Sequence, residues 1–242
     1  MQKLLSLMRK ALADYNMIKD GDKIAVGLSG GKDSIALLAL LAAYKKFSPE
    51  KFELLAINID LGFSDTDKSQ VQATKDFCQS IGVELIIEPT QIYDIILDRQ
   101  EKSPCSLCSK MRRGALNSVA NAHGCNKLAL GHHADDVLET FILSLIYEGR
   151  ISTFMPTSFM ERSNITLIRP LIYIEEKYLS GLARRYDLPI IHNPCPQDKH
   201  TKREDAKRLI NELDEKYGCK NRMMTALFHP ERNNLWDKII KP

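Results

Sequence analysis

The segment GLSGGKDS (27–34) concentrates residue types that bind phosphate. Its paired glycines, Gly30 and Gly31, permit positive φ angles and let the backbone approach a ligand closely. Lys32 adds a positive charge, and two serines add hydroxyl donors. An apolar segment precedes the turn and a helical pattern follows it, so free N–H groups at the helix start would face an anion. The sequence therefore predicts a phosphate-binding loop, because a plain turn does not require this combination.

The spacing within this segment excludes the two common phosphate loops. The G-x-x-x-x-G-K-[ST] loop carries Ser or Thr after its lysine, whereas Asp33 follows Lys32 here, and G-x-G-x-x-G is absent. SGGKDS instead resembles the PP-loop of the ATP pyrophosphatases, which cleave ATP between its α and β phosphates. The resemblance implies adenylation and a loop that grips the pyrophosphate end of ATP. The expected loop contacts are Ser29, Gly30, Gly31, Lys32, Asp33 and Ser34.

Polar residues follow two other predicted strands. Asp60 ends the apolar segment 52–60, and GHHADD (131–136) follows a short apolar segment. Ligands bind at the carboxyl ends of the strands in parallel sheets, so these residues are expected near the phosphate loop. Two adjacent aspartates suit Mg²⁺, although acidic residues also favour the first turn of a helix. We expect nucleotide contacts from Asp60, Gly131, His132 and Asp136, and a Mg²⁺ ligand in Asp135 or Asp136.

Three cysteines stand in segments suited to ligand binding. Serine and proline at 103–104 favour a helix start, which places Cys105 and Cys108 on one face of its first turns. The helix N-terminus is expected to lower the pKa of both thiols. Cys195 lies between two prolines in NPCPQD, which stiffens an extended loop. The pattern therefore predicts a site built from these three thiols.

The spacing of the cysteines leaves three kinds of site open. A C-x-x-C pair is used in half of a zinc site, in a redox pair and in a cluster site. Zinc would need a fourth ligand, for which His192 and His200 are candidates. Three cysteines holding a [4Fe–4S] cluster would instead leave one iron free to bind exogenous sulfide. The cysteines without a ligand role are Cys78, which is expected in the core, Cys125 and Cys219.

Composition and charge are those of an ordinary globular chain. Of 242 residues, 44% are hydrophobic and 27% are charged, with a net charge of +3. No apolar run reaches the ~18–20 residues of a membrane span. The N-terminus has the spacing of an amphipathic helix and not the continuous apolar core of a signal peptide. A cytoplasmic location is therefore expected, where disulfides are rare. Basic clusters near 110–113 and 199–208 indicate a polyanionic partner.

Short apolar segments alternate with helical patterns along most of the chain. This alternation predicts an α/β fold, a doubly wound parallel five-stranded sheet with helices on both faces. The expected strands are 23–29, 52–60, 83–89, 127–131 and 165–171. The expected helices are 32–46, 67–81, a stretch from 91, 135–147, 175–187 and 203–217. The predicted organisation is an N-terminal helix (1–19), an ATP-binding domain with the Cys-x-x-Cys helix (20–189) and a short helical C-terminal extension (190–242).

The order of the motifs resembles the tRNA 2-thiocytidine synthetase family of the PP-loop ATP pyrophosphatase superfamily. After the PP-loop come CSLCSKMRRG (105–114), GHHADDVLET (131–140), RPL (169–171) and a late Cys-Pro at 195–196. The resemblance covers residues 20–200 and implies the PP-loop/HUP fold of the adenine nucleotide alpha hydrolases. It also implies ATP-dependent thiolation at C2 of a cytidine in the tRNA anticodon loop, with Mg²⁺ and a [4Fe–4S] cluster.

The same resemblance implies roles for individual residues. It places the cluster on Cys105, Cys108 and Cys195. The implied catalytic residues are Lys32, Asp33, Arg112 and Asp135. The candidate RNA contacts are Arg113, Lys199, Lys202, Arg203, Lys207 and Arg208. The expected partners are tRNA, a sulfur donor (a cysteine desulfurase or sulfide) and a second copy of the chain in a homodimer.

Three alternatives fit parts of the same pattern. A tRNA 2-thiouridine synthetase of the superfamily would use the same loop. A cluster-free enzyme would carry a persulfide, with Cys108 and Cys195 acting as thiols. A structural-zinc protein would bind nucleotide and tRNA without catalysis. Iron–sulfur absorbance, zinc content and conversion of ATP to AMP distinguish the last two from the cluster enzyme.

Overall fold

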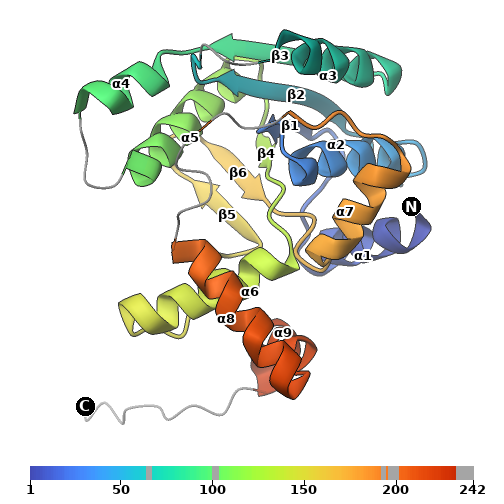
Figure 1. The fold of residues 1–242 in the computed structure, drawn as a ribbon. Helices are drawn as coiled ribbons and strands as arrows, with labels where there is room; N and C mark the ends of the chain where they lie inside the picture. Colours follow the sequence, from blue (N-terminus) through green and yellow to red (C-terminus); the bar gives the residue numbers. More distant parts are fainter. Residues whose placement is uncertain (64–66, 100–103, 192–194, 196–201, 233–242) are drawn as a thin grey trace, which may run out of the picture. The chain divides into compact units, whose positions relative to one another are not determined.

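Six strands form one sheet in the order β3-β2-β1-β4-β6-β5 (Figure 1). The strands are β1 (Lys23–Leu28), β2 (Glu53–Asp60), β3 (Glu84–Pro89), β4 (Lys127–Ala129), β5 (Thr157–Met160) and β6 (Ile165–Ile168). Five of them run parallel, and β5 pairs antiparallel with β6 at the edge. The parallel strands are those predicted from the sequence, so the doubly wound α/β fold is confirmed, with a sixth strand added.

The added strand β5 is the part of the sheet that the sequence pattern does not predict. Its four residues, TSFM, carry two hydroxyl side chains and none of them is buried. A strand this short, without a buried face of its own, shows no period-2 signal. It forms because β6 presents an edge at which Phe159 and Thr166, among other pairs, come into register.

Contacts divide the chain into two compact units. The computed structural model describes residues 1–63, 67–99, 104–191, 195 and 202–232. The first unit comprises Met1–Ala134 and Met155–Asp198, and the second comprises Asp135–Phe154 and Lys199–Pro242. The whole sheet lies in the first unit. The boundary predicted between residues 189 and 190 stays a prediction.

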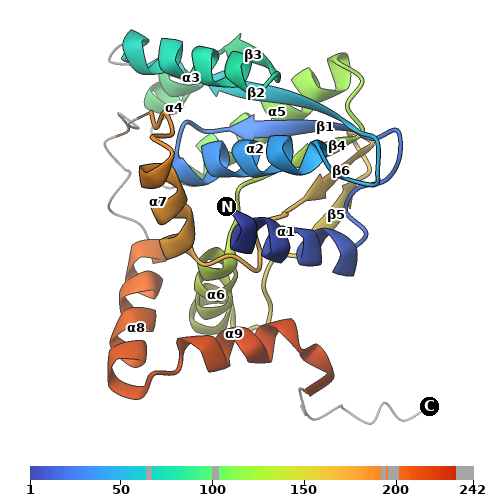
Figure 2. The ribbon, with the colours of Figure 1, turned by 90° about the vertical axis from the view of Figure 1, so that its right-hand side faces the viewer.

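Helices cover both faces of the sheet in the first unit. They are α1 (Gln2–Asp14), α2 (Lys32–Lys45), α3 (Lys68–Ser80), α4 (Ile92–Arg99), α5 (Pro104–Ala122) and α7 (Glu176–Arg185). Helices α2 and α3 lie on one face and α5 lies on the other (Figures 1 and 2). Helices α1 and α7 pack against α2, and α4 packs against α5. Because helices bury both faces of the sheet, the sequences of β1 and β2 are almost continuously apolar.

The two faces of the sheet have different cores. Nine of the 14 residues of α2 are buried, because α1, α7 and β1 enclose this helix. On the opposite face, α5 buries Leu116, Val119 and Ala120 in a cluster that includes Ile57 of β2 and Leu128 of β4. The helix that starts at the phosphate loop and the helix that carries two cysteines are therefore both anchored on the sheet.

Strand register brings the carboxyl ends of β1 and β2 together. Leu28 is opposite Asn58 in the parallel ladder, and the Asn58 side-chain amide donates to the Leu28 carbonyl at 2.8 Å. The chain leaves β1 at Ser29, and β2 ends two residues beyond Asn58, at Asp60. These ends form the edge at which ligands bind in such sheets.

The second unit is helical in the part that the structure describes. Its elements are α6 (Ala134–Leu143) from residue 135 onward, a π-helical turn (Ser144–Glu148), α8 (Lys202–Tyr217), α9 (Lys220–Phe228) and a 3₁₀ turn (Pro230–Arg232). Buried apolar residues come from α6 (Val137, Leu138, Ile142), α8 (Ala206, Ile210) and α9 (Met224). The predicted helices 135–147 and 203–217 are found. The sequence does not predict α9, which is nine residues long and begins without a side-chain cap.

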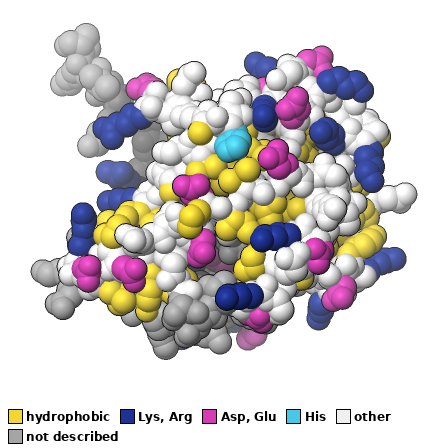
Figure 3. All heavy atoms as spheres, turned by 90° about the horizontal axis from the view of Figure 1, so that it is seen from above, with side chains coloured by type: hydrophobic (Ala, Val, Ile, Leu, Met, Phe, Trp, Pro, Cys, Tyr) yellow, Lys and Arg dark blue, Asp and Glu magenta, His cyan; other side chains and the backbone are white. Residues whose placement is uncertain are grey.

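No helix in the described ranges is long and apolar enough to cross a membrane. Figure 3 shows lysines and arginines interspersed with aspartates and glutamates on the face that it presents. The small net charge of +3 thus corresponds to a mixture of both signs on this face, without one uninterrupted basic patch.

A buried ion pair ties the start of β1 to β4. The Lys127 ammonium lies 2.7 Å from the Asp22 carboxylate, and both side chains are less than 10% exposed. Lys127 Nζ also donates to the Met17 carbonyl at 2.6 Å. Asp22 accepts from the Asn126 side chain at 2.8 Å and from the Lys19 backbone N–H at 2.6 Å. Each buried charge is therefore both paired and hydrogen-bonded, as burial requires.

Replacing Asp22 by Asn tests this pair. The substitution leaves the Lys127 ammonium buried without a countercharge, so we expect the free energy of unfolding to fall by about 3 kcal/mol. Urea unfolding followed by circular dichroism measures the change. The matched control is Glu53→Gln, which breaks the exposed Lys23–Glu53 pair of 3.8 Å and is expected to cost under about 0.5 kcal/mol. Equal effects of the two substitutions would show that the buried pair is not a major contributor.

Candidate functional site

The loop between β1 and α2 requires glycine at position 30. Gly30 has a φ of +83°, which L side chains rarely adopt. A Cβ atom there would lie 2.7 Å from Ile191 Cβ. The Ile191 N–H donates to the Gly30 carbonyl at 2.9 Å, so residue 191 holds the loop from outside. The turn is thus closed by a segment far away in the sequence.

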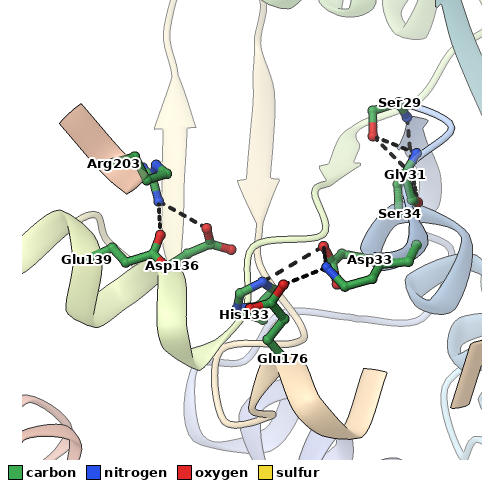
Figure 4. Close-up of polar contacts among 10 residues, drawn as sticks. Ser29, Gly31, Asp33, Ser34, His133, Asp136, Glu139, Glu176 and Arg203 are labelled. Atoms are coloured by element: carbon green, nitrogen blue, oxygen red, sulfur yellow. Dashed lines mark hydrogen bonds and ion pairs between the residues drawn. The ribbon is translucent and has the colours of Figure 1, made fainter. Parts of the chain in front are cut away.

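The two serines of the loop stabilise its turn. Ser34 Oγ donates to the Gly31 carbonyl at 2.8 Å and accepts from the Ser29 backbone N–H at 3.2 Å (Figure 4). Ser29 Oγ lies 3.2 Å from Ser34 Oγ and accepts from the Gly31 N–H at 3.3 Å. The hydroxyls shape the backbone, and the N–H groups at the start of α2 supply the partial positive charge for an anion.

Lys32 lies between two carboxylates. Its Nζ donates to Glu176 Oε1 at 2.8 Å and to Asp33 Oδ2 at 3.1 Å. Burial lowers the pKa of Lys32, but the hydrogen bond to Glu176 and the charge of Asp33 outweigh it, so the net pKa is raised. Lys32 is therefore a permanent positive charge at neutral pH. Sequence reasoning missed Glu176, since no local spacing links the start of α7 to the loop.

The end of β4 packs directly on the first turn of α2. A Cβ atom at Gly131 would lie 3.0 Å from the Ser34 backbone nitrogen and from the Asp33 carbonyl carbon. His133, which is buried, places its Nε2 3.8 Å from Asp33 Oδ2. Gly131 is thus in the predicted position beside the loop, where glycine lets the two backbones approach. His133, which was not among the predicted site residues, belongs to the same contact.

His132 contacts an arginine from the neighbouring strand end. Arg169 follows β6, and its Nε donates to His132 Nδ1 at 3.3 Å. Burial and then the charge of Arg113 lower the pKa of Arg169 to about 10. Arg113 of α5, a predicted RNA contact, therefore lies close to Arg169. The RPL motif marked Arg169 only as part of a resemblance, and its contact with His132 has no local sequence signal.

Asp60 ends β2 at the same edge of the sheet, as predicted. Its Oδ1 accepts from the Gly62 N–H at 3.0 Å. Its backbone carbonyl accepts from the Thr90 N–H at 2.9 Å and from the Thr90 hydroxyl at 2.7 Å. The Asp60 backbone is therefore held to the segment that follows β3, while its nucleotide contact stays a prediction.

The two aspartates of α6 are paired with cations of the second unit. Asp135 forms an ion pair with Lys220 of α9. Arg203 donates to Asp136 at 3.0 Å and to Glu139 at 3.1 Å (Figure 4), and also to Thr140 at 3.3 Å. A Mg²⁺ ion at Asp135 would have to displace the Lys220 ammonium. The charge of Arg203, expected to contact RNA, is instead matched by two carboxylates of its own unit.

The other basic candidates of the second unit differ in what they contact. Lys202 Nζ lies 4.1 Å from the ring centroid of Tyr147, and Arg208 is ion-paired to Asp205 at 2.5 Å. Lys207 is in α8, in the turn after Arg203. Lys199, together with the alternative ligands His192 and His200, lies outside the described residues. An RNA role for Lys202, Lys207 and Arg208 stays a prediction.

Three cysteines come close to one another in the first unit. Cys108 is half-buried against the core on α5, and the charges of Arg112, Cys195 and Cys105 all act on its thiol. Burial raises the pKa of Cys108, and the opposing charge of Arg112 does not compensate. The expectation that the helix start lowers this pKa is therefore wrong, because desolvation exceeds the effect of the nearby positive charge. Cys105, by contrast, is exposed.

The remaining cysteines have structural surroundings. Cys78 is buried, as predicted, and burial raises its pKa to about 11. Cys125 is also buried, and Cys219 Sγ lies 3.5 Å from the Leu213 carbonyl in the second unit. Among the residues that the structure describes, no group of three or more His, Cys, Asp or Glu side chains is close enough together to hold a single metal ion. Cys105, Cys108 and Cys195 are thus neighbours without being closed around one ion.

Comparison with known proteins identifies the family. A family model for the PP-loop domain matches residues 2–213. A tRNA-cytidine(32) 2-sulfurtransferase from Geobacter metallireducens is 36% identical over 99% of this chain and 94% of its own length. The protein of the same name from Bordetella pertussis is 39% identical over 96% of this chain and 72% of its own length. This chain belongs to the tRNA-cytidine 2-sulfurtransferase family of PP-loop proteins.

Solved structures agree with this family assignment. The U34-tRNA thiolase NcsA from Methanococcus maripaludis, solved with its [4Fe–4S] cluster, has a TM-score of 0.75 and 26% identity over 98% of this chain and 81% of its own. An NH₃-dependent NAD synthetase from Campylobacter jejuni shares the fold alone, with a TM-score of 0.52 and 16% identity. The predicted family and the predicted fold are both confirmed.

Gly30→Ala tests the loop in this family member. The new side chain would face an unfavourable φ and a contact of 2.7 Å with Ile191, so we expect a loss of stability above about 2 kcal/mol and at least tenfold weaker ATP binding. Gly21→Ala is the matched control, because Gly21 has a φ of +79° but nothing within 4 Å of its Cβ position. Thermal unfolding and calorimetric titration with ATP measure both effects. Equal results for the two variants would exclude a special role for the Ile191 contact.

Alkylation of the metal-free, reduced protein tests the thiol surroundings. Cys105 is exposed, whereas Cys108 is half-buried with a raised pKa, so iodoacetamide should label Cys105 about tenfold faster at pH 8. Labelling of Cys108 should rise with pH over a more alkaline range than that of an ordinary thiol, because its reactive thiolate forms only as the pH approaches the raised pKa. Peptide mass spectrometry follows each site, with buried Cys78 as the slow control. Faster labelling of Cys108 than of Cys105 at pH 7 would contradict the raised pKa.

Proposed function

We propose that this protein is an ATP-dependent tRNA sulfurtransferase that replaces the C2 oxygen of a cytidine in the anticodon loop with sulfur. The observation that carries the proposal is the proximity of Cys105, Cys108 and Cys195 in the unit that also holds the PP-loop. A nucleotide loop alone is compatible with many reactions. Three neighbouring thiols in the same unit restrict the chemistry to sulfur transfer or metal binding.

The PP-loop carries the adenylation half of the reaction. The C2 oxygen of the base attacks the α-phosphorus of ATP, the bond to the bridging oxygen breaks, and pyrophosphate leaves. Lys32 and the N–H groups at the start of α2 offset the charge that develops on the phosphates. Lys32 is available for this because its raised pKa keeps it protonated. AMP bound to the base is then a good leaving group for incoming sulfur.

The three cysteines fit a [4Fe–4S] cluster. The donor set is all sulfur, Cys105 is exposed for access, and Cys108 is anchored on the core of the sheet. When bound by three cysteines, the cluster supplies an iron with an open position for exogenous sulfide. Sulfide that attacks C2 forms the C–S bond while the C–O bond to AMP breaks, so no electrons are gained or lost in this step. The cysteine thiols must lose their protons to bind iron; at Cys108 burial raises the pKa, the charge of Arg112 offsets part of this, and binding to iron would supply the rest.

The raised pKa of Cys108 disfavours the cluster-free alternative. A persulfide enzyme needs a thiolate nucleophile near neutral pH, and burial works against that at Cys108. Cytidine is favoured over uridine, since relatives at 36–39% identity are named for cytidine and the uridine enzyme is 26% identical. A structural zinc site would differ from the cluster in its metal content, so metal analysis of the purified protein distinguishes the two.

Further parts of the proposal concern partners and location. Arg112 and Arg113 follow the cysteines on α5 and are proposed to hold tRNA phosphate or the adenylate, joined by Lys202 and Lys207. Mg²⁺ accompanies ATP, and Asp135, which is ion-paired to Lys220, is proposed as a ligand. A sulfur donor (a cysteine desulfurase or sulfide), a homodimer and a cytoplasmic location complete the proposal.

Anaerobic purification and reconstitution test the metal site. The expected product is brown protein with about four irons per chain and broad absorbance near 400 nm. Cys105→Ala, Cys108→Ala and Cys195→Ala should each lose the colour. Cys219→Ala is the matched control, because Cys219 lies in the other unit and should leave the colour unchanged. Colourless protein with one zinc per chain would overturn the cluster.

Turnover and tRNA analysis test the reaction. With tRNA and a sulfide source, the loaded protein should convert ATP to AMP, and nucleoside mass spectrometry should detect 2-thiocytidine. A deletion strain should lack that nucleoside and regain it with the wild-type gene. Lys32→Met should abolish AMP formation without loss of colour, because the loop and the cluster are separate sites. No AMP formation by loaded wild-type protein would overturn the enzyme proposal.

A further inference from the structure

Arg169 and His132 meet at the ends of neighbouring strands. His132 stands three residues after β4, Arg169 directly follows β6, and β4 pairs with β6. The Leu130 N–H donates to the Ile168 carbonyl at 3.1 Å, which keeps the two strand ends together beyond the ladder. Arg169 Nε then donates to His132 Nδ1 at 3.3 Å. The contact thus rests on the sheet itself rather than on a loose loop.

We infer that Arg169 holds His132 as the neutral tautomer with its proton on Nε2, so that His132 presents a hydrogen-bond donor at the carboxyl end of β4. A guanidinium has only donors, so the ring nitrogen that it contacts must accept. Nδ1 is therefore the unprotonated nitrogen, and the proton of the neutral ring lies on Nε2. The role of the Nε2–H donor in the reaction rests on the proposed function. The tautomer of His132 does not.

Arg169 is built to keep this orientation. Arg169 as a whole residue is only 7% exposed. Its Nη1 donates to the Met155 carbonyl, and its backbone N–H donates to the Pro156 carbonyl at 3.0 Å. The guanidinium is thus anchored on the segment leading into β5 while Nε faces the histidine. A residue held at several points cannot easily rotate away when a ligand binds beside it.

Charge at this point also favours the neutral histidine. A proton on His132 Nδ1 would face the N–H of Arg169, two donors without an acceptor between them. The ring therefore serves as a donor without carrying a charge.

A neutral, fixed donor suits the oxygen atoms of the adenylation step. His132 follows Gly131, whose backbone touches the first turn of α2, so it is one residue from the phosphate loop contact. An Nε2–H group can donate to a phosphate oxygen of ATP or to the oxygen between C2 and AMP. Arg169 does not touch the reacting atoms in this scheme. It is a positioning residue that acts through His132.

Nitrogen NMR of histidine-labelled protein tests the tautomer directly. The ¹⁵N-imidazole signals of His132 are assigned by their loss in His132→Asn, and His123, which is exposed, is the reference signal. In wild type we expect an unprotonated Nδ1 and a protonated Nε2. Arg169→Met should convert His132 to averaged tautomers or to the Nδ1–H form, whereas Arg169→Lys, which keeps a donor, should retain the wild-type pattern. Arg162→Gln, at an exposed arginine, is the matched control and should change nothing.

Kinetics link the tautomer to the reaction. Arg169→Met should lower kcat for AMP formation about tenfold with a smaller change in KM for ATP, and Arg169→Lys should restore part of it. The double variant Arg169→Met, His132→Asn should be no slower than His132→Asn alone. A protonated Nδ1 in wild type, or an unchanged His132 pattern in folded Arg169→Met, would overturn the inference. Both results stand even if the wild type forms no AMP, an outcome that would count only against the proposed function. The spectrum of the wild-type protein tests the tautomer by itself, so the inference can still be tested if a variant fails to fold.

Discussion

The contact between the end of β4 and the first turn of α2 is the constraint on which the site depends. A Cβ atom at Gly131 would be 3.0 Å from the backbone of Asp33 and Ser34, so only glycine lets these elements approach without displacement. Because α2 is buried by α1, α7 and β1, it cannot move away. The phosphate loop is therefore held from both ends, by β1 before it and by a buried helix after it, and Ile191 closes it from outside.

Charge balance around the loop follows from this geometry. Lys32 is paired with Asp33 in its own helix and with Glu176 at the start of α7, so the packing of α7 on α2 also sets the position of the lysine. A polyphosphate that approaches the loop competes with Glu176 for the same ammonium. Glu176 therefore holds the place that a phosphate group of ATP can take. Lys32 has an anionic partner with or without ATP, which keeps it protonated in both states.

Much of the fold follows from local patterns, whereas the partners within the site do not. The apolar runs of β1 and β2 and the glycine pair of the loop predicted a buried sheet and a phosphate turn, because such signals are local. Glu176 and Lys220 meet their partners across long stretches of chain, so their spacing carries no information. The pKa of Cys108 was predicted with the wrong sign, since the helix start is visible in the sequence but burial on the sheet is not. Strand β5 was missed because its stability comes from the edge of β6.

The helix that carries two of the cysteines is fixed to the strand that ends in the loop. A Cβ atom at Gly27 of β1 would lie 2.8 Å from Leu116 Cδ2, so α5 rests directly on β1 where a larger residue would push it away. Leu116 is two turns of helix beyond Cys108 and belongs to the same core cluster. The separation between the cysteines of α5 and the phosphate loop is therefore set by sheet packing. If sulfur is delivered to a base activated at that loop, its path is determined by rigid elements, and the substrate must adapt to the enzyme. An anticodon-loop base, which leaves its stack at little cost, is suited to do so.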